Sequence, residues 1–203
     1  MNFLAHLHLS GNDCNVMTGN FIGDFVKGRD LATKFGTGIA RGVDLHRSID
    51  EFTDHHPVVR QSKNRLRPKY RHYAGVIVDI FYDHFLAANW TTYSEEPLPH
   101  YADRVYKIIL DQHAILPERV NQMLPYMMRD NWLINYANLD GIRRVLNGMS
   151  RRATFDSKME EATEDLKNSY PAFKSEFEEF FPALKDFSEQ WLKRVATDSK
   201  TDR

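Results

Sequence analysis

The chain has 203 residues, of which 42% are hydrophobic and 27% charged, and its formal net charge is -1. These values fit one soluble domain, residues 1–203, with a single substantial core, and they give no reason to expect a nucleic acid or a membrane as partner. Because the first residues lack the basic start of a secretory signal and Cys14 is the one cysteine, we expect a cytoplasmic protein without an internal disulfide.

Apolar residues recur at helical spacing along most of the chain and predict an all-α domain of roughly seven to nine helices. A first long helix is expected from Ile39 to about Asp54, with Pro57 just beyond its end. The next is expected from Val76 to Trp90, a segment without glycine or proline. Strand signals are nearly absent, because no pair of β-rich runs brackets a hairpin turn.

The second half predicts four further helices: Tyr101–His113, Glu118–Met128, Leu139–Leu146 and Phe155–Asn168. Pro125 should kink or end the second of these, and Asn147-Gly148 is typical of the C-cap of the third. A last helix is expected to begin at Ser169-Tyr170-Pro171, with the proline in its first turn. Pro182 should interrupt it.

The first chemical pattern is the pair His46 and Asp50, which stand four residues apart. In a helix this spacing places both side chains on one face about a turn from each other, and Asp54 continues the row. An imidazole nitrogen and a carboxylate oxygen at this separation can share one divalent ion. The alternative is an ordinary ion pair on a helix surface.

Carboxylates in apolar surroundings form the second pattern. Asp79 and Asp83 repeat the four-residue spacing inside an apolar helix, and Asp24 stands in the apolar run Phe21–Val26. An ionised carboxylate is costly to bury unless it is paired or bound to a metal. Capping of a neighbouring helix or pairing with an arginine is the alternative. His6 is most simply a polar residue near a chain end, and otherwise a further ligand.

The recurrence of these patterns within the first 84 residues favours a metal site. Mixed imidazole and carboxylate ligands suit Mn, Fe, Mg or Zn, whereas a thiolate site would need cysteines. Such an ion lowers the pKa of bound water and neutralises charge on phosphate oxygens, and Arg47, Lys27 and Arg29 flank the same segments as candidates to hold a phosphate. The residues therefore predict metal-dependent hydrolysis of a phosphate ester.

A locally basic stretch lies between His55 and Val78, which contains no Asp or Glu. On a nearly neutral protein it indicates either a patch for an acidic partner or a solvated helix face. Its six basic residues are Arg60, Lys63, Arg65, Arg67, Lys69 and Arg71.

Five ordered stretches resemble the bacterial acyl carrier protein phosphodiesterase family: MNFLAHLHLS at the start, GNFIGDFVKG at 19–28, GVDLHRSIDEFTDHHPVV at 42–59, VDIFYDHFLAANW at 78–90 and VLNGMSRR at 145–152. The family is similar to HD-type metal-dependent phosphohydrolases. The resemblance implies an all-helical, HD-domain-like fold, a divalent cation that is usually manganese, and a role in the fatty acid pathway. The implied reaction hydrolyses the phosphodiester between 4'-phosphopantetheine and a serine of holo-acyl carrier protein.

Carried over by position, the resemblance implies metal-site residues Asp24, His46, Asp50, Asp79, Asp83 and His84, with His6 as a further candidate. It ranks Asp24, His46 and Asp83 first, and adds Arg47 to these three as catalytic. The adjacent His-Asp pair of HD-type enzymes is absent, and only the reversed pairs Asp54-His55 and Asp83-His84 occur. This departure leaves open which residues ligate directly and which orient the ligands.

The resemblance also gives the basic stretch a use, since acyl carrier proteins are small and acidic and could dock on it. Tyr82, Phe85 and Trp90 are candidates to line a channel for the pantetheine arm, or else belong to the core. Two other hypotheses remain: an HD-type phosphohydrolase acting on a nucleotide, and a helical module that binds acyl carrier protein without turnover. The number of ions and the oligomeric state are not predicted.

Overall fold

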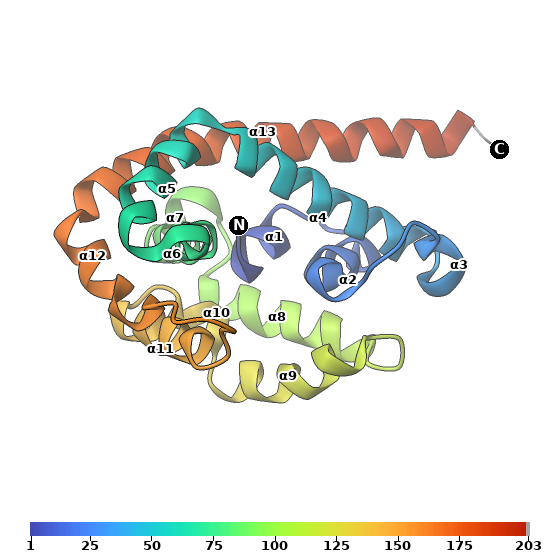
Figure 1. The fold of residues 1–203 in the computed structure, drawn as a ribbon. Coiled ribbons are helices and arrows are strands. Elements are labelled where there is room, and N and C mark those ends of the chain that lie inside the picture. Colours follow the sequence, from blue (N-terminus) through green and yellow to red (C-terminus); the bar gives the residue numbers. More distant parts are fainter. Residues whose placement is uncertain (202–203) are drawn as a thin grey trace.

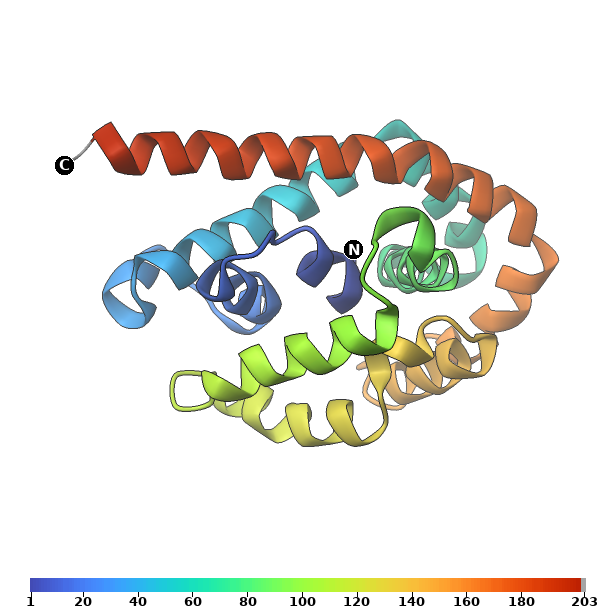
Figure 2. The ribbon, with the colours of Figure 1, turned by 180° about the vertical axis from the view of Figure 1, so that it is seen from behind.

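The computed structural model describes residues 1–201, and side chains as far as residue 195. This part of the chain contains helices and no β-strand, which confirms the all-α prediction (Figures 1 and 2). The α-helices are α1 (Phe3–His8), α2 (Cys14–Ile22), α3 (Leu31–Phe35), α4 (Thr37–His55), α5 (Pro57–Tyr70), α6 (Ala74–Ala88), α7 (Trp90–Tyr93), α8 (Leu98–Asp111), α9 (Glu118–Arg129), α10 (Trp132–Asn135), α11 (Leu139–Ser150), α12 (Ala162–Asn168) and α13 (Tyr170–Thr201). Short 3-10 turns lie at Gly23–Phe25, Arg71–Tyr73 and Met159–Glu161.

The core is built around α6, whose apolar side chains are buried on nearly all sides. Helix α13 crosses the molecule along one side and contributes buried Phe173, Phe177 and Phe181 (Figure 1). Helices α4 and α5 meet at Pro57, which begins α5 where no backbone N–H is needed. Among the described residues, no helix combines the length and apolar character required to cross a bilayer.

Helices α2 and α4 cross in unusually close contact, and two glycines permit it. A Cβ atom on Gly19 would lie 2.0 Å from the Ile39 carbonyl oxygen, and one on Gly42 would lie 2.1 Å from that of Val16. At these two positions backbone therefore packs against backbone, with no side chain between the two helices. This contact brings the end of α2, just before Asp24, alongside His46 on α4.

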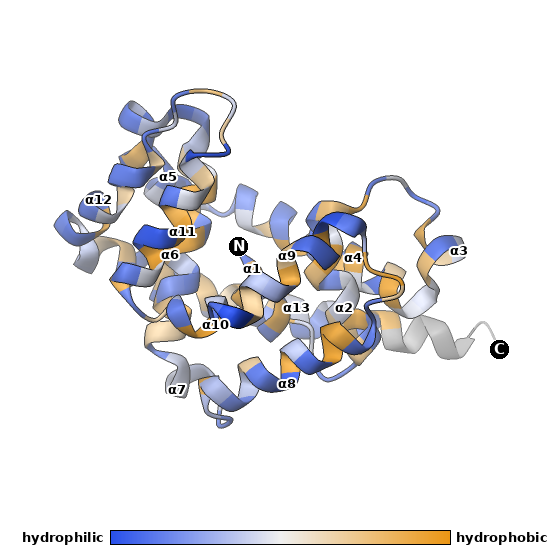
Figure 3. Cartoon of the chain, turned by 90° about the horizontal axis from the view of Figure 1, so that it is seen from below, coloured by the Kyte–Doolittle hydropathy of each residue, from blue (hydrophilic) through white to orange (hydrophobic). Residues whose placement is uncertain are grey.

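Helix α1 has six residues and is too short to be stable alone. The buried carboxylate of Asp83 on α6 holds its start, accepting hydrogen bonds from the backbone N–H groups of Leu4 at 2.8 Å, Asn2 at 3.2 Å and Ala5 at 3.3 Å. Helix α1 lies between α6 on one side and α4 on the other (Figures 1 and 3). Asp83 thus fixes the helix that carries His6 at the centre of the molecule.

Two prolines lie inside continuous helices. Helix α9 continues past Pro125 to Arg129, and α13 continues past Pro182. Each proline deprives the carbonyl four residues earlier of its partner, and those carbonyls belong to exposed Asn121 and Glu178, where water can replace the lost bond. The expected interruption at Pro182 was therefore wrong.

Two boundaries also differ from the prediction. Helix α11 runs through Asn147-Gly148 to Ser150 instead of ending there, because Gly148 does not adopt the positive φ of a C-cap glycine. The helix expected from Phe155 begins only with the turn at Met159, because Lys158 adopts a left-handed backbone with φ of 55°. Phe155 is exposed.

Candidate metal centre and adjoining cavity

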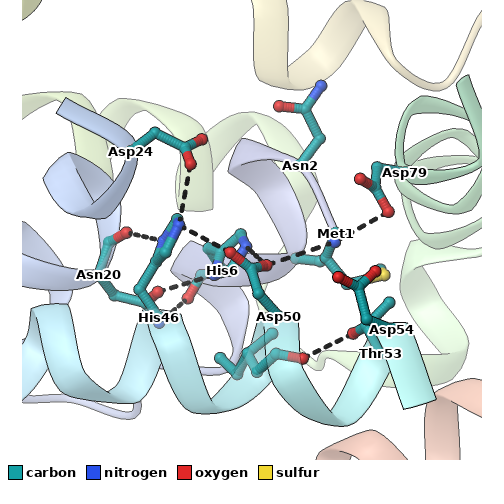
Figure 4. A network of polar contacts seen from close by, with 12 residues as sticks. Met1, Asn2, His6, Asn20, Asp24, His46, Asp50, Thr53, Asp54 and Asp79 are labelled. Carbon is teal, nitrogen blue, oxygen red and sulfur yellow. Dashed lines mark hydrogen bonds and ion pairs between the residues drawn. The ribbon is translucent and has the colours of Figure 1, made fainter. Parts of the chain in front are cut away.

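Three side chains from two distant segments meet in one cluster: His6 on α1, and His46 and Asp50 on α4 (Figure 4). One potential ligand atom from each lies within 4.8 Å of the others. The two carboxylate oxygens of Asp50 divide between the rings, with Oδ1 at 3.2 Å from His6 Nε2 and Oδ2 at 3.2 Å from His46 Nε2. The imidazole rings stack with centroids 3.9 Å apart. The predicted His46–Asp50 pair thus gains His6 as its third member.

A single residue, Asn20 on α2, orients both rings. His6 Nδ1 lies 2.8 Å from Asn20 Oδ1, and His46 Nδ1 lies 2.8 Å from the Asn20 backbone oxygen. The amide nitrogen of Asn20 donates to the His6 backbone oxygen and to Ser10 Oγ, so its Oδ1 is the acceptor. Both histidines therefore carry a proton on Nδ1, and the Nε2 atom of each ring faces Asp50.

The buried Nε2 atom of His6 has no hydrogen-bond partner within the described residues, although an Asp50 oxygen lies 3.2 Å away. A lone pair that faces a carboxylate at this distance is repelled unless a proton or a cation lies between them. Two imidazole nitrogens and a carboxylate oxygen form a donor set that divalent transition metals accept. The residues present therefore fit a divalent ion.

The electrostatics of the cluster agree with this geometry. Burial alone would lower the pKa of His46, but contacts with Asp24 and Asp50 outweigh burial and raise the pKa to about 9. Burial and the nearby His46 lower the pKa of His6. Burial would raise the pKa of Asp50, yet its contacts with the two rings lower it. The cluster thus stabilises positive charge, and metal binding at Nε2 of His46 would require loss of its second proton.

Asp24 extends the cluster toward solvent. Its Oδ1 lies 3.3 Å from His46 Nε2, and its side chain is 72% exposed. The hydrogen bond with His46 lowers the pKa of Asp24. Gly23 permits this approach, because a Cβ atom at that position would lie 2.2 Å from His46 Cγ. Asp24 is therefore beside the candidate metal centre, on its open side, and outside the three clustered side chains.

Asp79 lies next to the cluster through the amine of Met1. The amine nitrogen is 3.0 Å from Asp79 Oδ1 and 3.8 Å from Asp50 Oδ1 (Figure 4). Burial would lower the pKa of this amine, but the two carboxylates outweigh burial and raise the pKa. Asp79 thus pairs with a cation of the chain and neighbours the three clustered side chains without joining them.

Asp83 and His84 lie apart from the cluster. Asp83 is fully buried and caps α1, and burial raises its pKa to about 7 against the effect of the N–H groups that it binds. His84 uses both ring nitrogens elsewhere, with Nδ1 at 2.8 Å from the Tyr136 backbone oxygen and Nε2 at 3.0 Å from Tyr170 Oη. The reversed Asp83-His84 pair is thus engaged in holding helices together.

Arg47 points away from the cluster as well. Its guanidinium donates to the Gly28 backbone oxygen at 3.0 Å and lies 3.7 Å from a carboxylate oxygen of Asp44. These contacts tie α4 to the loop before α3. The contacts of Arg47 therefore do not support its predicted role in binding a phosphate beside His46.

A cavity of about 1300 Å³ adjoins the cluster. Asp24, Asp50 and Asp79 line one end of it. The opposite wall comes from one face of α9 and one face of α11, and its lining residues there are Arg119, Gln122, Met123, Tyr126, Gly141, Arg144, Val145, Gly148, Met149 and Arg152. A reaction at the candidate metal centre would thus take place at the end of a cavity with a partly apolar wall.

Sequence reasoning missed this wall and the role of Asn20. The spacing 141, 144, 145, 148, 149 and 152 is that of one helix face and could have indicated it. The residues proposed for a channel do not line the cavity: Tyr82, Phe85 and Trp90 are buried in the core. Tyr82 bonds to Ser62, and Trp90 Nε1 donates to the Glu96 backbone oxygen.

In this helical domain, two oriented imidazoles and a carboxylate meet beside a large cavity. The protein therefore belongs to the class of helical proteins with a candidate divalent-metal centre. Comparison with known proteins narrows this class. A family model described as acyl carrier protein phosphodiesterase matches residues 1–184. The chain belongs to this family.

Curated relatives cover almost the whole chain. The acyl carrier protein phosphodiesterase of Enterobacter sp. (strain 638) is 36% identical over 186 residues, which are 91% of this chain and 95% of that protein. The protein of the same name from Photorhabdus laumondii is 34% identical over 194 residues, 93% of this chain and 96% of its own length. No solved structure matches the chain.

Proposed function

We propose that the protein is a cytoplasmic, metal-dependent phosphodiesterase. Its reaction would hydrolyse the bond between 4'-phosphopantetheine and the serine of holo-acyl carrier protein, to give apo-acyl carrier protein and free 4'-phosphopantetheine. The observation that carries the proposal is the His6–His46–Asp50 cluster, in which the Nε2 atoms of both rings face one carboxylate beside a large cavity. Family membership supplies the substrate, because the relatives are named for it.

His6, His46 and Asp50 would hold the ion, which we propose to be manganese. A bound divalent ion would lower the pKa of water and neutralise charge on phosphate oxygens. The buried rings cannot rotate freely, because Asn20 fixes their Nδ1 atoms. The chain therefore presents preorganised ligands, which reduces the cost of ordering them on binding.

Asp24 is placed to accept a proton during the reaction. Its carboxylate reaches the cavity and lies 3.3 Å from His46 Nε2, so it is ionised and close to the cluster. A general base must lie within hydrogen-bond reach of the proton that it removes. We assign Asp24 the role of orienting the attacking water and taking its proton.

The cavity gives the pantetheine arm a place to lie. Its volume of about 1300 Å³ exceeds that of many small-molecule sites, which span roughly 300–1000 Å³. Met123, Tyr126 and Met149 offer apolar contact on the wall opposite Asp24. The methylene groups of the arm would bury against these residues while the phosphate lies at the cluster.

The basic residues of α5 and the turn after it can contribute to docking of the acidic carrier protein only in part. Lys63 pairs with Asp54, Lys69 pairs with Asp165 and Glu161, and Arg65 forms a two-bond ion pair with Glu176. These three charges are already compensated within the chain. We therefore propose that Arg60, Arg67 and Arg71 carry whatever long-range attraction this stretch provides.

A mass measurement tests the function directly. Purified protein with Mn²⁺ should convert holo-acyl carrier protein to the apo form with loss of the phosphopantetheine mass, and His46→Ala and Asp50→Asn should abolish this conversion. Asp44→Asn is the matched control on the same helix, since Asp44 is exposed and outside the cluster. Release of phosphate from nucleotides, or binding of carrier protein without hydrolysis under any divalent metal, would contradict the proposal.

A further inference from the structure

Three arginines on the far wall of the cavity have no role in the site described above. Arg119 stands in the first turn of α9, Arg144 on α11, and Arg152 just after α11. All three are exposed, and none has a hydrogen bond or an ion pair with another residue in the described part of the chain. Some other exposed arginines are paired, such as Arg143 with Asp140 and Arg104 with Glu96.

Acidic and basic residues lie on different sides of the cavity. Asp24, Asp50, Asp54 and Asp79 line the side beside the candidate metal centre, whereas the arginines lie on the α9 and α11 faces. The acidic group on that wall is Asp130, which accepts two hydrogen bonds from Arg129, at 2.7 and 2.8 Å. Arg129 thus compensates its charge, and the nearby Arg144 contributes less to lowering its pKa.

The exposed positions indicate the kind of partner. Guanidinium groups in water gain little from a single small anion, because solvent and salt screen the attraction. Several of them spread over two helices gain more from an extended anionic surface, which also orients the partner. Arginine suits this purpose because its planar fork binds carboxylates through two bonds.

We propose that Arg119, Arg144 and Arg152 form a docking rim for an acidic protein surface that brings its phosphodiester to the cavity. The inference rests on the proposed function for the reaction, and adds the surface on which the protein part of the substrate lies. Carboxylates of the partner pair with the rim, while the attached arm passes between α9 and α11 toward His6 and His46. The rim determines affinity and orientation, and the cluster performs the chemistry.

Neighbouring arginines provide a matched control for this proposal. Arg144→Glu/Arg152→Glu reverses two charges on the cavity face of α11, and Arg143→Glu/Arg151→Glu makes the same change one residue earlier, outside the cavity lining. Binding of fluorescently labelled apo-acyl carrier protein at low salt should weaken about tenfold or more for the first variant and change far less for the second. KM for the holo protein should rise in the same ratio, with kcat nearly unchanged.

Equal losses in both variants would show a general charge effect and overturn the rim. So would unchanged binding in Arg144→Glu/Arg152→Glu, or a loss confined to binding of nucleic acid or anionic vesicles. The binding assay uses the apo carrier protein and needs no turnover, so the proposed reaction can fail while the docking rim stands. Circular dichroism of both variants checks that each keeps its helical content.

Discussion

At the scale of residues, the candidate site depends on how two histidine rings are held. Asn20 offers its side-chain oxygen to His6 and its backbone oxygen to His46, so one residue sets the tautomer of both. The His46–Asp50 pair was predicted from its four-residue spacing. The orienting role of Asn20 could not be predicted, and neither could the place of His6 among the three clustered side chains. Both depend on contacts between segments that the sequence pattern does not place together.

Replacing Asn20 by Ala removes the partner of His6 Nδ1 and leaves the backbone contact to His46 in place. His6 would then be free to rotate or change tautomer, and loss of such an orienting group typically weakens metal binding about 10- to 100-fold. Titration of the apoprotein with Mn²⁺ measures this change. Asn15→Ala, at an exposed position on the same helix, should bind Mn²⁺ as the wild type does. Equal Mn²⁺ affinity of the two variants would show that Asn20 does not orient the metal ligands.

Gly23→Ala tests the close packing against His46. A Cβ atom 2.2 Å from the ring carbon cannot be accommodated without displacing the ring. We expect at least a tenfold loss of hydrolysis at saturating substrate, since a small misplacement of a catalytic group has a large effect on rate. Gly75→Ala is the control, because its added Cβ would meet only Lys63 Cε at 3.8 Å. A wild-type rate for Gly23→Ala would show that His46 need not occupy this position.

At the scale of elements, the sequence pattern predicts the long helices, but the ends of several helices differ from the prediction. Amphipathic spacing and family resemblance both locate α4 and α6, because their apolar faces are long and regular. Helix α1 could not be predicted in this way, since a six-residue helix is maintained by the carboxylate of Asp83 from another part of the chain. The apolar surroundings of Asp83 did indicate a buried carboxylate. Its partner is the start of α1, in agreement with the alternative that it caps a neighbouring helix.

Asp83→Ala should therefore act through α1. Removing the carboxylate leaves buried backbone N–H groups without an acceptor, at a cost of about 1–3 kcal/mol. Urea unfolding should show this loss of stability, and Mn²⁺ affinity should fall with it because His6 is no longer held in place. A variant with wild-type stability that nevertheless fails to bind metal would instead indicate direct ligation by Asp83.

At the scale of the whole molecule, distant helices enclose one cavity. The cluster comes from α1 and α4, while the facing wall comes from α9 and α11. Sequence patterns indicate which face of each helix is special, but they do not say which faces oppose each other. The docking prediction for α5 illustrates this limit, since its basic residues were visible in the sequence and the acidic partners on α12 and α13 were not.

Arg65 connects α5 to α13 and tests that interpretation. It donates two hydrogen bonds of 2.8 Å to the mostly buried Glu176. Arg65→Ala should lower the free energy of unfolding by roughly 2 kcal/mol, as expected for hydrogen bonds to a charged group. Arg60→Ala should leave stability unchanged, because Arg60 is exposed and has no partner among the described residues. Equal stability of the two variants in thermal unfolding would contradict a structural role for Arg65.

The proposed metal centre consists of His6, His46 and Asp50 at the end of the cavity. The most direct measurement is the anomalous diffraction signal of manganese in crystals of the protein grown with Mn²⁺. If this centre binds manganese, a peak should appear within about 2.3 Å of Nε2 of His6, Nε2 of His46 and a carboxylate oxygen of Asp50. A peak at Asp83 and His84, or no peak at the cluster under saturating Mn²⁺, would contradict it.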